Sequence, residues 1–127
     1  MSEPTPVFPA PNQQYAQQRK RLAPEPADAF KALSRSVFAE GALSAKTKQL
    51  IAVAVAHVTQ CPYCIKGHTK GALQHDATPE QIMEAIWVAA EMRAGAAYAH
   101  SMIALETISQ AQDNSQAPDA ADENQGV

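Results

Sequence analysis

The sequence predicts an all-α protein, and three observations lead to this fold class. Between residues 27 and 109 the chain is rich in Ala, Leu, Glu, Lys and Gln, which are strong helix formers. Apolar residues recur at helical spacing in several segments. Prolines and glycines fall at the expected starts and ends of those segments. At 127 residues the chain fits one domain that can bury a core without disulfide bonds.

The two ends of the chain differ in composition from its middle. Residues 1–26 contain six of the nine prolines, so they are expected to form an arm and not to begin with a long helix. Residues 110–127 are mostly Gln, Asp, Asn, Ser and Ala, the composition of a disordered polar tail. We therefore expect an N-terminal arm (1–26), a helical domain (27–109) and a polar tail (110–127).

The first two helices of the domain are expected between residues 28 and 59. The first runs over about residues 28–40 and ends at Gly41, which suits a helix C-cap. The second begins after Ser44, a good N-cap, and continues to about Thr59. Its middle, residues 50–56, is apolar nearly all round. Such a helix is buried on most sides or packs against another subunit, so we expect a homo-oligomer.

The remaining helices follow two proline signals. A third helix is expected over residues 62–74, because Pro62 suits the first helical turn. The segment Thr78–Gln81 predicts the start of a fourth helix, with an N-cap, a proline at the first helical position and a glutamine that closes a capping box. Gly95 is expected to kink or break this helix before a last one that ends near Ile108.

The only two cysteines, Cys61 and Cys64, stand at the expected start of the third helix. Their spacing brings the sulfurs within reach of each other, and the helix dipole lowers the pKa of a thiol at that position. His68 follows Cys64 by four residues, one turn along the same face, where it can take or relay a proton. This segment indicates a thiol oxidoreductase whose working residues are Cys61, Cys64 and His68.

Two other uses of these residues stay open. The cysteines can be ordinary buried side chains beside a surface histidine. Alternatively, Cys61, Cys64 and His68 can act as three zinc ligands. His57 is a poor fourth ligand, because on a continuous helix it would lie about 16 Å from His68 along the axis. His100 or water would then complete the site. We expect the redox use, with no metal and no cofactor.

Charge and hydropathy exclude other function classes. The net charge is −3, and the acidic excess lies in the polar tail, so the rest of the chain has no basic footprint for nucleic acid. No apolar stretch reaches the roughly 20 residues that span a membrane. Residues 1–11 lack the basic-then-apolar order of a secretory signal. We therefore expect a cytoplasmic protein, where a paired Cys-x-x-Cys is redox-active or metal-binding.

Residues 43–105 resemble the alkyl hydroperoxidase D-like branch of the carboxymuconolactone decarboxylase superfamily. The segments that carry the resemblance are residues 43–54, Cys61 to Cys64 with His68, and residues 77–85. It implies an all-helical bundle that forms homo-trimers or homo-hexamers. It also implies a cysteine pair that reduces hydroperoxides and is re-reduced by a partner thiol–disulfide protein. By this likeness Cys64 attacks the peroxide, Cys61 resolves the sulfenic acid as a disulfide, and His68 belongs to the proton relay.

The chain departs from that branch at two positions. Members with peroxidase chemistry carry a relay glutamate twelve residues before the first cysteine, and here that residue is Gln49, whose amide cannot act as a base. Tyr63 stands between the cysteines where those members have a histidine. His57, one turn before Cys61, is either a substitute relay base or a structural neutral histidine bonded to a nearby carbonyl.

Three functions follow from these observations. The first is a thiol-dependent hydroperoxide reductase with peroxiredoxin-type antioxidant activity. The second is a decarboxylase, but decarboxylating members of the superfamily lack the cysteine pair. The third is a non-catalytic redox-sensing or interaction oligomer, which the incomplete relay keeps open.

Overall fold

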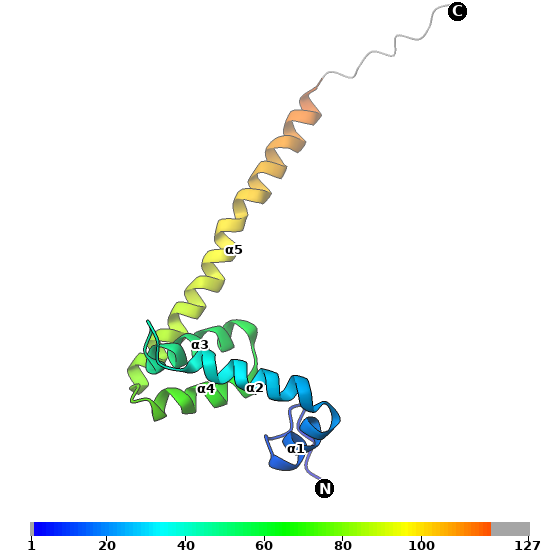
Figure 1. Ribbon diagram of the computed structural model, residues 1–127. Coiled ribbons are helices and arrows are strands. Elements are labelled where there is room, and N and C mark those ends of the chain that lie inside the picture. Colours follow the sequence, from blue (N-terminus) through cyan, green and yellow to red (C-terminus); the bar gives the residue numbers. More distant parts are fainter. Residues whose placement is uncertain (1, 118–127) are drawn as a thin grey trace, which may run out of the picture. The chain divides into compact units, whose positions relative to one another are not determined.

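The computed structural model describes residues 2–117, and within them the chain forms five helices and no β-strand (Figure 1). The helices are, in chain order, α1 (Gln13–Leu22), α2 (Pro24–Phe38), α3 (Ala45–Thr59), α4 (Pro62–Gln74) and α5 (Pro79–Gln116). The all-α fold class is confirmed.

The N-terminal part of the chain is more helical than its prolines suggest. Helix α1 starts after Asn12, whose Oδ1 accepts a hydrogen bond of 2.8 Å from the Tyr15 backbone N–H. Helix α2 starts at Pro24, so the predicted start near Asp28 is wrong. A proline in the first helical turn lacks only an N–H that would have no partner within the helix, and it therefore permits the earlier start. Residues 13–22, which we expected to be an arm, are helical.

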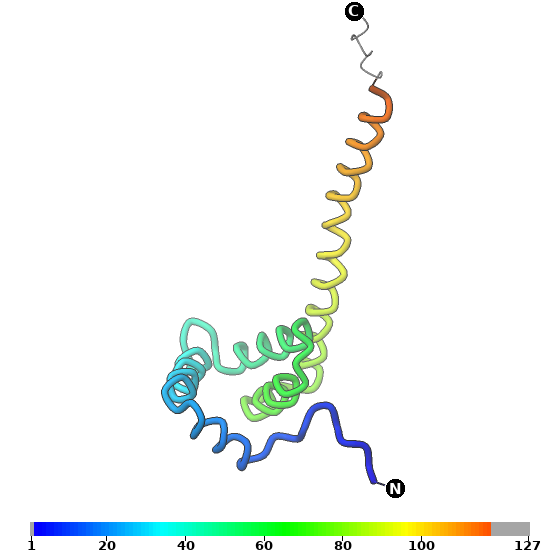
Figure 2. Tube along the Cα trace, turned by 90° about the vertical axis from the view of Figure 1, so that its right-hand side faces the viewer, coloured from blue at the N-terminus to red at the C-terminus, as the bar shows by residue number. Residues whose placement is uncertain are grey.

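Helices α3 and α4 have the predicted bounds. The Ser44 Oγ accepts a hydrogen bond of 3.1 Å from the Thr47 N–H and caps α3. Gln60 follows the last residue of α3 in the left-handed conformation, with φ 58°. The chain turns there, and α4 runs back along α3 (Figure 2). Of the described helices, these two pack most extensively on each other.

Helix α5 begins as predicted but does not break. The Thr78 N–H donates to the Gln81 side chain at 3.0 Å, and the Gln81 N–H donates back to the Thr78 hydroxyl at 3.1 Å, which is the predicted capping box. The helix continues through Gly95 to Gln116, so the predicted break and the predicted end near Ile108 are wrong. A helical glycine costs roughly 1 kcal/mol relative to alanine, which a long alanine-rich helix tolerates.

The chain divides into two compact units, residues 1–91 and residues 92–127. The core of the first unit is small. It consists of Val53, Ala72, Ala77 and Ile82, with Leu50 and Ile86 packed against them. Among the described residues, Val53 is the only large side chain that is fully buried. The predicted helical domain therefore has a narrow seam of buried side chains and no broad core.

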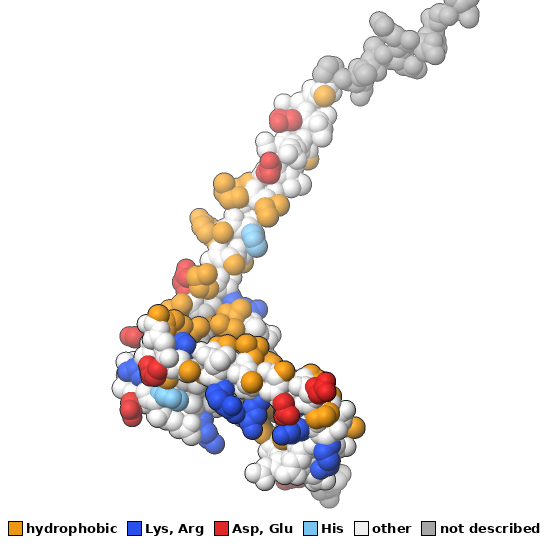
Figure 3. Space-filling model, viewed as in Figure 1, with side chains coloured by type: hydrophobic (Ala, Val, Ile, Leu, Met, Phe, Trp, Pro, Cys, Tyr) orange, Lys and Arg blue, Asp and Glu red, His pale blue; other side chains and the backbone are white. Residues whose placement is uncertain are grey.

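The described part of the second unit is residues 92–117, and residues 92–116 of it belong to α5. Helix therefore extends into residues 110–116, the first part of the predicted polar tail, whereas residues 118–127 lie outside the described residues. Large apolar side chains on this stretch are more than half exposed: Met92, Tyr98, Met102, Ile103, Leu105 and Ile108. Figure 3 shows apolar side chains at the surface along α5.

These side chains do not share one face of the helix. Tyr98, Met102 and Leu105 follow the i, i+4, i+7 pattern, whereas Ile103 lies roughly 140° away from Tyr98 at 100° per residue. A helix that is apolar on several sides needs cover on several sides. Among residues 2–117, no helix combines the length and apolar character needed to cross a membrane.

We propose that copies of the chain supply this cover, in a homo-trimer or homo-hexamer. A double substitution of Tyr98→Glu and Met102→Glu, which adds charge to the exposed apolar face, should shift the protein to smaller species. Light scattering coupled to gel filtration measures this shift. The control is Gln110→Glu, which adds a charge to a polar part of the same helix and should leave the mass unchanged. A stable monomer of the unmodified chain at micromolar concentration would contradict the proposal.

Candidate functional site

The two cysteines lie at the first turn of α4. Cys61 is the N-cap residue, and Pro62 is the first residue of the helix. The Cys64 backbone N–H donates to the Cys61 Sγ at 3.3 Å. The two Sγ atoms are 2.9 Å apart, and both thiols are free and partly buried. The pair thus lies at a helix start, as the sequence predicts, and the sulfurs need to approach by only about 0.9 Å to reach disulfide length.

The two thiols have pKa shifts of opposite direction. The pKa of Cys61 is lowered, chiefly by the hydrogen bond with the Cys64 side chain and then by the Cys64 backbone N–H. The pKa of Cys64 is raised by the hydrogen bond with the Cys61 side chain, by burial and by the charge on Cys61. The partial positive charge of the α4 N-terminus favours the same arrangement. Of the two thiols, Cys61 is therefore the one whose thiolate is favoured.

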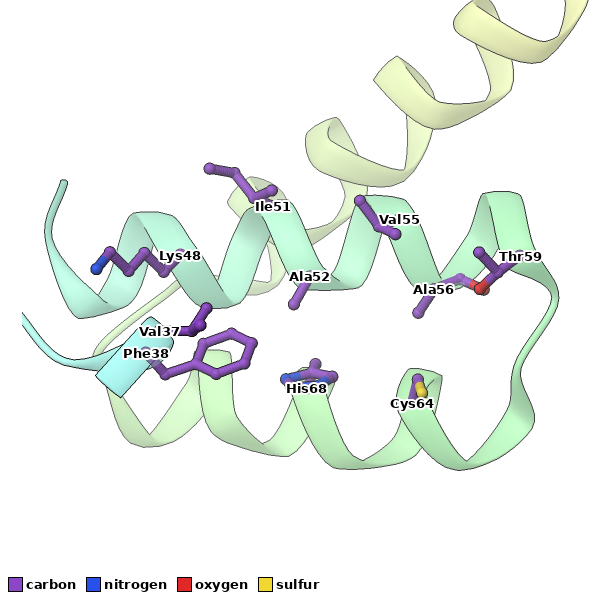
Figure 4. Close-up of a pocket in the computed structure, with 10 residues that line it drawn as sticks. All are labelled: Val37, Phe38, Lys48, Ile51, Ala52, Val55, Ala56, Thr59, Cys64 and His68. Atoms are coloured by element: carbon purple, nitrogen blue, oxygen red, sulfur yellow. The ribbon is translucent and has the colours of Figure 1, made fainter. Parts of the chain in front are cut away.

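His68 lies one turn after Cys64 on α4, and both side chains point toward α3 (Figure 4). Its Nδ1 is hydrogen-bonded to the Gln49 Oε1 of α3 at 2.9 Å. The Phe38 ring, at the end of α2, stacks on the imidazole with centroids 5.0 Å apart and planes inclined by 25°. Three helices therefore fix the orientation of this one side chain.

Cys64 and His68 line a pocket of about 400 Å³ between α2, α3 and α4 (Figure 4). The lining residues are Val37, Phe38, Lys48, Ile51, Ala52, Val55, Ala56, Thr59, Cys64 and His68. Most of the lining is apolar. The thiol and the imidazole are therefore presented to a space suited to a molecule with an apolar body.

Lys48 also lines this pocket, and its ammonium group is bound to a backbone carbonyl. Its Nζ donates to the Ala39 carbonyl at 2.7 Å, just after the last residue of α2. A cation at this position is favoured by the negative end of the α2 dipole. The contact ties α2 to α3 next to Phe38, and it thereby helps to hold that ring against His68.

Gly71 is a residue of the site that sequence reasoning missed. A Cβ built at this position would lie 2.5 Å from the Gln49 Oε1 and 2.9 Å from its Cδ. Gln49 can therefore occupy its place beside His68 only because residue 71 has no side chain. A glycine in the middle of a predicted helix, three residues after His68, was the available signal. Phe38, the other missed residue, gave no signal beyond its apolar side chain.

His57 takes a different position from His68. Its Nδ1 is bonded to the Val53 carbonyl of its own helix at 2.7 Å, and it does not line the pocket. This is the carbonyl bond of the structural alternative, and the relay role stays a prediction. His100 is exposed on the described helix of the second unit.

A metal site gains no support from the described geometry. Within residues 2–117, no group of three or more His, Cys, Asp or Glu side chains is placed to hold a metal ion. The zinc alternative with Cys61, Cys64 and His68 needed such a group.

The residue between the cysteines contacts the N-terminal segment. The Tyr63 hydroxyl donates to the Pro9 carbonyl at 2.7 Å. The Phe8 ring meets the Tyr63 ring edge-on, with centroids 6.1 Å apart. The start of the chain is thereby joined to the thiol motif through Tyr63, where the sequence alone showed only the absence of a histidine.

A sequence model of the carboxymuconolactone decarboxylase family matches residues 24–107. A Paracoccus denitrificans protein named "Uncharacterized protein 4 in cox locus" is 74% identical over 81 residues, which are 64% of this chain and 73% of that protein. An uncharacterized protein of Haemophilus influenzae is 38% identical over 86 residues, 68% of this chain and 76% of its own length.

Two crystal structures show the same fold. A protein from Methanobacterium thermoautotrophicum superposes with a TM-score of 0.62 at 35% identity, over 65% of this chain and 93% of its own. A carboxymuconolactone decarboxylase family protein from Legionella pneumophila superposes with a TM-score of 0.57 at 39% identity, over 62% of this chain and 70% of its own.

The opposite pKa shifts predict which cysteine reacts first with an alkylating agent. With limiting iodoacetamide at neutral pH, the reduced protein should be modified at Cys61 before Cys64, because the thiolate is the nucleophile. Mass spectrometry of peptides measures the order. Cys64→Ala removes the main hydrogen bond to the Cys61 thiolate, so it should move Cys61 alkylation to higher pH. Preferential modification of Cys64 would contradict the assignment.

Proposed function

Since the chain belongs to the carboxymuconolactone decarboxylase family, we propose that its cysteine pair makes it a thiol-dependent hydroperoxide reductase with peroxiredoxin-type activity. One observation carries this proposal. Cys64 and His68 line the same pocket, and the Cys61 sulfur lies 2.9 Å from the Cys64 sulfur. A nucleophile, a proton acceptor and a resolving thiol thus lie within about two helical turns, from the N-cap of α4 to His68.

In the first step Cys64 attacks the outer oxygen of a hydroperoxide ROOH. The S–O bond forms as the O–O bond breaks, and Cys64 becomes a sulfenic acid. His68 accepts the Cys64 proton and returns it to the departing alkoxide, which leaves as the alcohol ROH. A base is needed because the pKa of Cys64 is raised by its contact with Cys61 and by burial.

In the second step Cys61 attacks the sulfur of the sulfenic acid. The S–S bond forms as the S–O bond breaks, and the departing hydroxide takes a proton from the solvent and leaves as water. The lowered pKa of Cys61 supplies the thiolate for this attack. A partner dithiol protein then returns the two electrons by thiol–disulfide exchange and becomes a disulfide itself. This partner and a reducing, cytoplasmic setting belong to the proposal.

The pocket supports a substrate class as well as a reaction. Its lining is largely aliphatic, and the Lys48 ammonium at its edge is bound to a backbone carbonyl. An organic hydroperoxide with an apolar body would displace water from this lining, whereas hydrogen peroxide would leave it wet. We therefore place alkyl or aryl hydroperoxides ahead of hydrogen peroxide as substrates.

A redox-sensing oligomer is the second candidate. The hydrogen bond from Tyr63 to Pro9 favours it. Tyr63 lies between the two cysteines, so formation of their disulfide would change the backbone at the residue that holds the N-terminal segment. A sensor would form the same disulfide once but would not turn over with a dithiol. The decarboxylase alternative uses neither cysteine.

One stoichiometric equivalent of cumene hydroperoxide should oxidise Cys61 and Cys64 to one disulfide within each chain. With excess dithiothreitol, the protein should consume further hydroperoxide in repeated turnover. The loss of hydroperoxide measures this turnover. Cys61→Ser should stop at a Cys64 sulfenic acid that dimedone traps, and Cys64→Ser should not react. Disulfide formation without turnover would favour the sensor. Thiols that stay reduced would contradict both functions.

His68→Gln should slow peroxide-driven thiol oxidation by about 10²-fold, the usual loss when a general base is removed. The rate of disappearance of free thiols measures it, and circular dichroism checks the fold. His57→Gln is the comparison. We expect a smaller loss there, because the His57 Nδ1 is bonded to the Val53 carbonyl. A loss at position 57 as large as at position 68 would make His57 the relay base.

A further inference from the structure

The residue at the relay position, Gln49, makes one directed contact with the proposed base. Its Oε1 is 2.9 Å from the His68 Nδ1. An amide oxygen accepts hydrogen bonds and cannot donate, so the proton of this contact belongs to Nδ1. A neutral imidazole carries one N–H, and its other nitrogen then has a free lone pair. The contact therefore leaves Nε2 of His68 as the proton acceptor.

The position of Gln49 is set by the packing of α4 on α3. Besides the 2.5 Å to Oε1, a Cβ at position 71 would lie 3.3 Å from the Gln49 Nε2. Every terminal atom of the amide therefore needs the space that Gly71 leaves. A glycine inside a helix costs roughly 1 kcal/mol relative to alanine, and here its lack of a side chain gives the amide its place.

Among the described residues that line the pocket with His68, none carries a carboxylate that could take over this contact. Phe38 of α2 covers one face of the ring. From α3 the neighbours that line the same pocket include one titratable group, Lys48, which is bound to the Ala39 carbonyl. From α4 the titratable neighbour is Cys64. A neutral amide adds no negative charge that would stabilise an imidazolium, whereas a glutamate at position 49 would.

We infer that Gln49 is a positioning residue: it holds His68 in the Nδ1–H tautomer, so that Nε2 accepts the proton of Cys64. The inference rests on the proposed function for its role in turnover. The tautomer itself is a property of the resting protein. This role requires a hydrogen-bond acceptor beside His68 but not a base, so the amide of Gln49 can fill it.

The test uses three variants and one control in the full chain. Gln49→Leu removes the acceptor, and Gln49→Glu keeps it with a negative charge. Gly71→Ala displaces the amide without changing it. Gln74→Leu is the matched control, because it removes an exposed amide from the last residue of α4. Circular dichroism and gel filtration confirm that each variant folds and assembles.

Nitrogen-15 NMR of the imidazoles reads the tautomer directly. The unmodified protein and the Gln74→Leu control should show His68 protonated at Nδ1. Gln49→Leu should lose this preference, and Gly71→Ala should weaken it. Protonation at Nε2 in the unmodified protein, or an unchanged spectrum in Gln49→Leu, would overturn the inference whatever the enzyme activity.

The rate of Cys64 alkylation in a Cys61→Ser background measures how readily Cys64 loses its proton, and it needs no peroxide. Gln49→Leu should slow it by roughly ten- to a hundredfold, the range seen when a group that orients a histidine is removed. Gln49→Glu should retain the reaction but move its half-maximal rate to higher pH, because the carboxylate stabilises the imidazolium. If the imidazole that Gln49 contacts does not take the Cys64 proton, a charge at position 49 leaves this pH profile in place, so an unmoved profile would overturn the positioning role.

The two outcomes separate this inference from the proposed function. If the NMR and alkylation results are as expected and the protein reduces no hydroperoxide, the proposed function fails and the positioning role of Gln49 stands. If hydroperoxides are reduced but neither measurement responds to Gln49→Leu, the function stands and the inference fails.

Discussion

The close approach of α4 to α3 is the constraint on which the site depends. Val53 of α3 is fully buried, and Ala72 of α4 is buried with it, so the two helices meet through small side chains. Gly71, next to Ala72, leaves the space that the Gln49 amide fills beside His68. A larger side chain in this seam would separate the helices or displace the amide. The dimensions of the core therefore set the orientation of the imidazole, because tightly packed interiors do not absorb added volume freely.

The electrostatics of the thiol pair follow from its place at the start of α4. A thiol in the N-cap position accepts the Cys64 backbone N–H and lies in the positive field of the helix N-terminus, so Cys61 is ionised first. The contact between the sulfurs then makes ionisation of Cys64 harder. The geometry that favours the thiolate of Cys61 thus makes a base necessary at Cys64. His68 lies one turn after Cys64.

The distribution of apolar surface connects the fold to its surroundings. Most of the buried side chains that the structure describes are alanines, whereas large side chains on α2, α3 and α5 stay exposed. Small cores contribute little stability, so association that covers these surfaces would stabilise the fold as well. The thiol pocket itself is lined entirely by residues 37–68 of the first unit. The residues that would carry the chemistry therefore all belong to the first unit.

The features that could be predicted from the amino-acid sequence are those that short-range hydrogen bonds control. The helix starts at Ser44 and Thr78 are set by side chains that cap the backbone three residues away, and the Cys-x-x-Cys spacing fixes the sulfurs at one helical turn. The continuation of α5 was missed because a single glycine penalty is small beside the cooperativity of a long helix. Only the tertiary structure brought Gln49 to His68, since the two residues lie on different helices and are nineteen positions apart. Their contact depends on how closely two helices pack, and no local pattern in the chain encodes that distance.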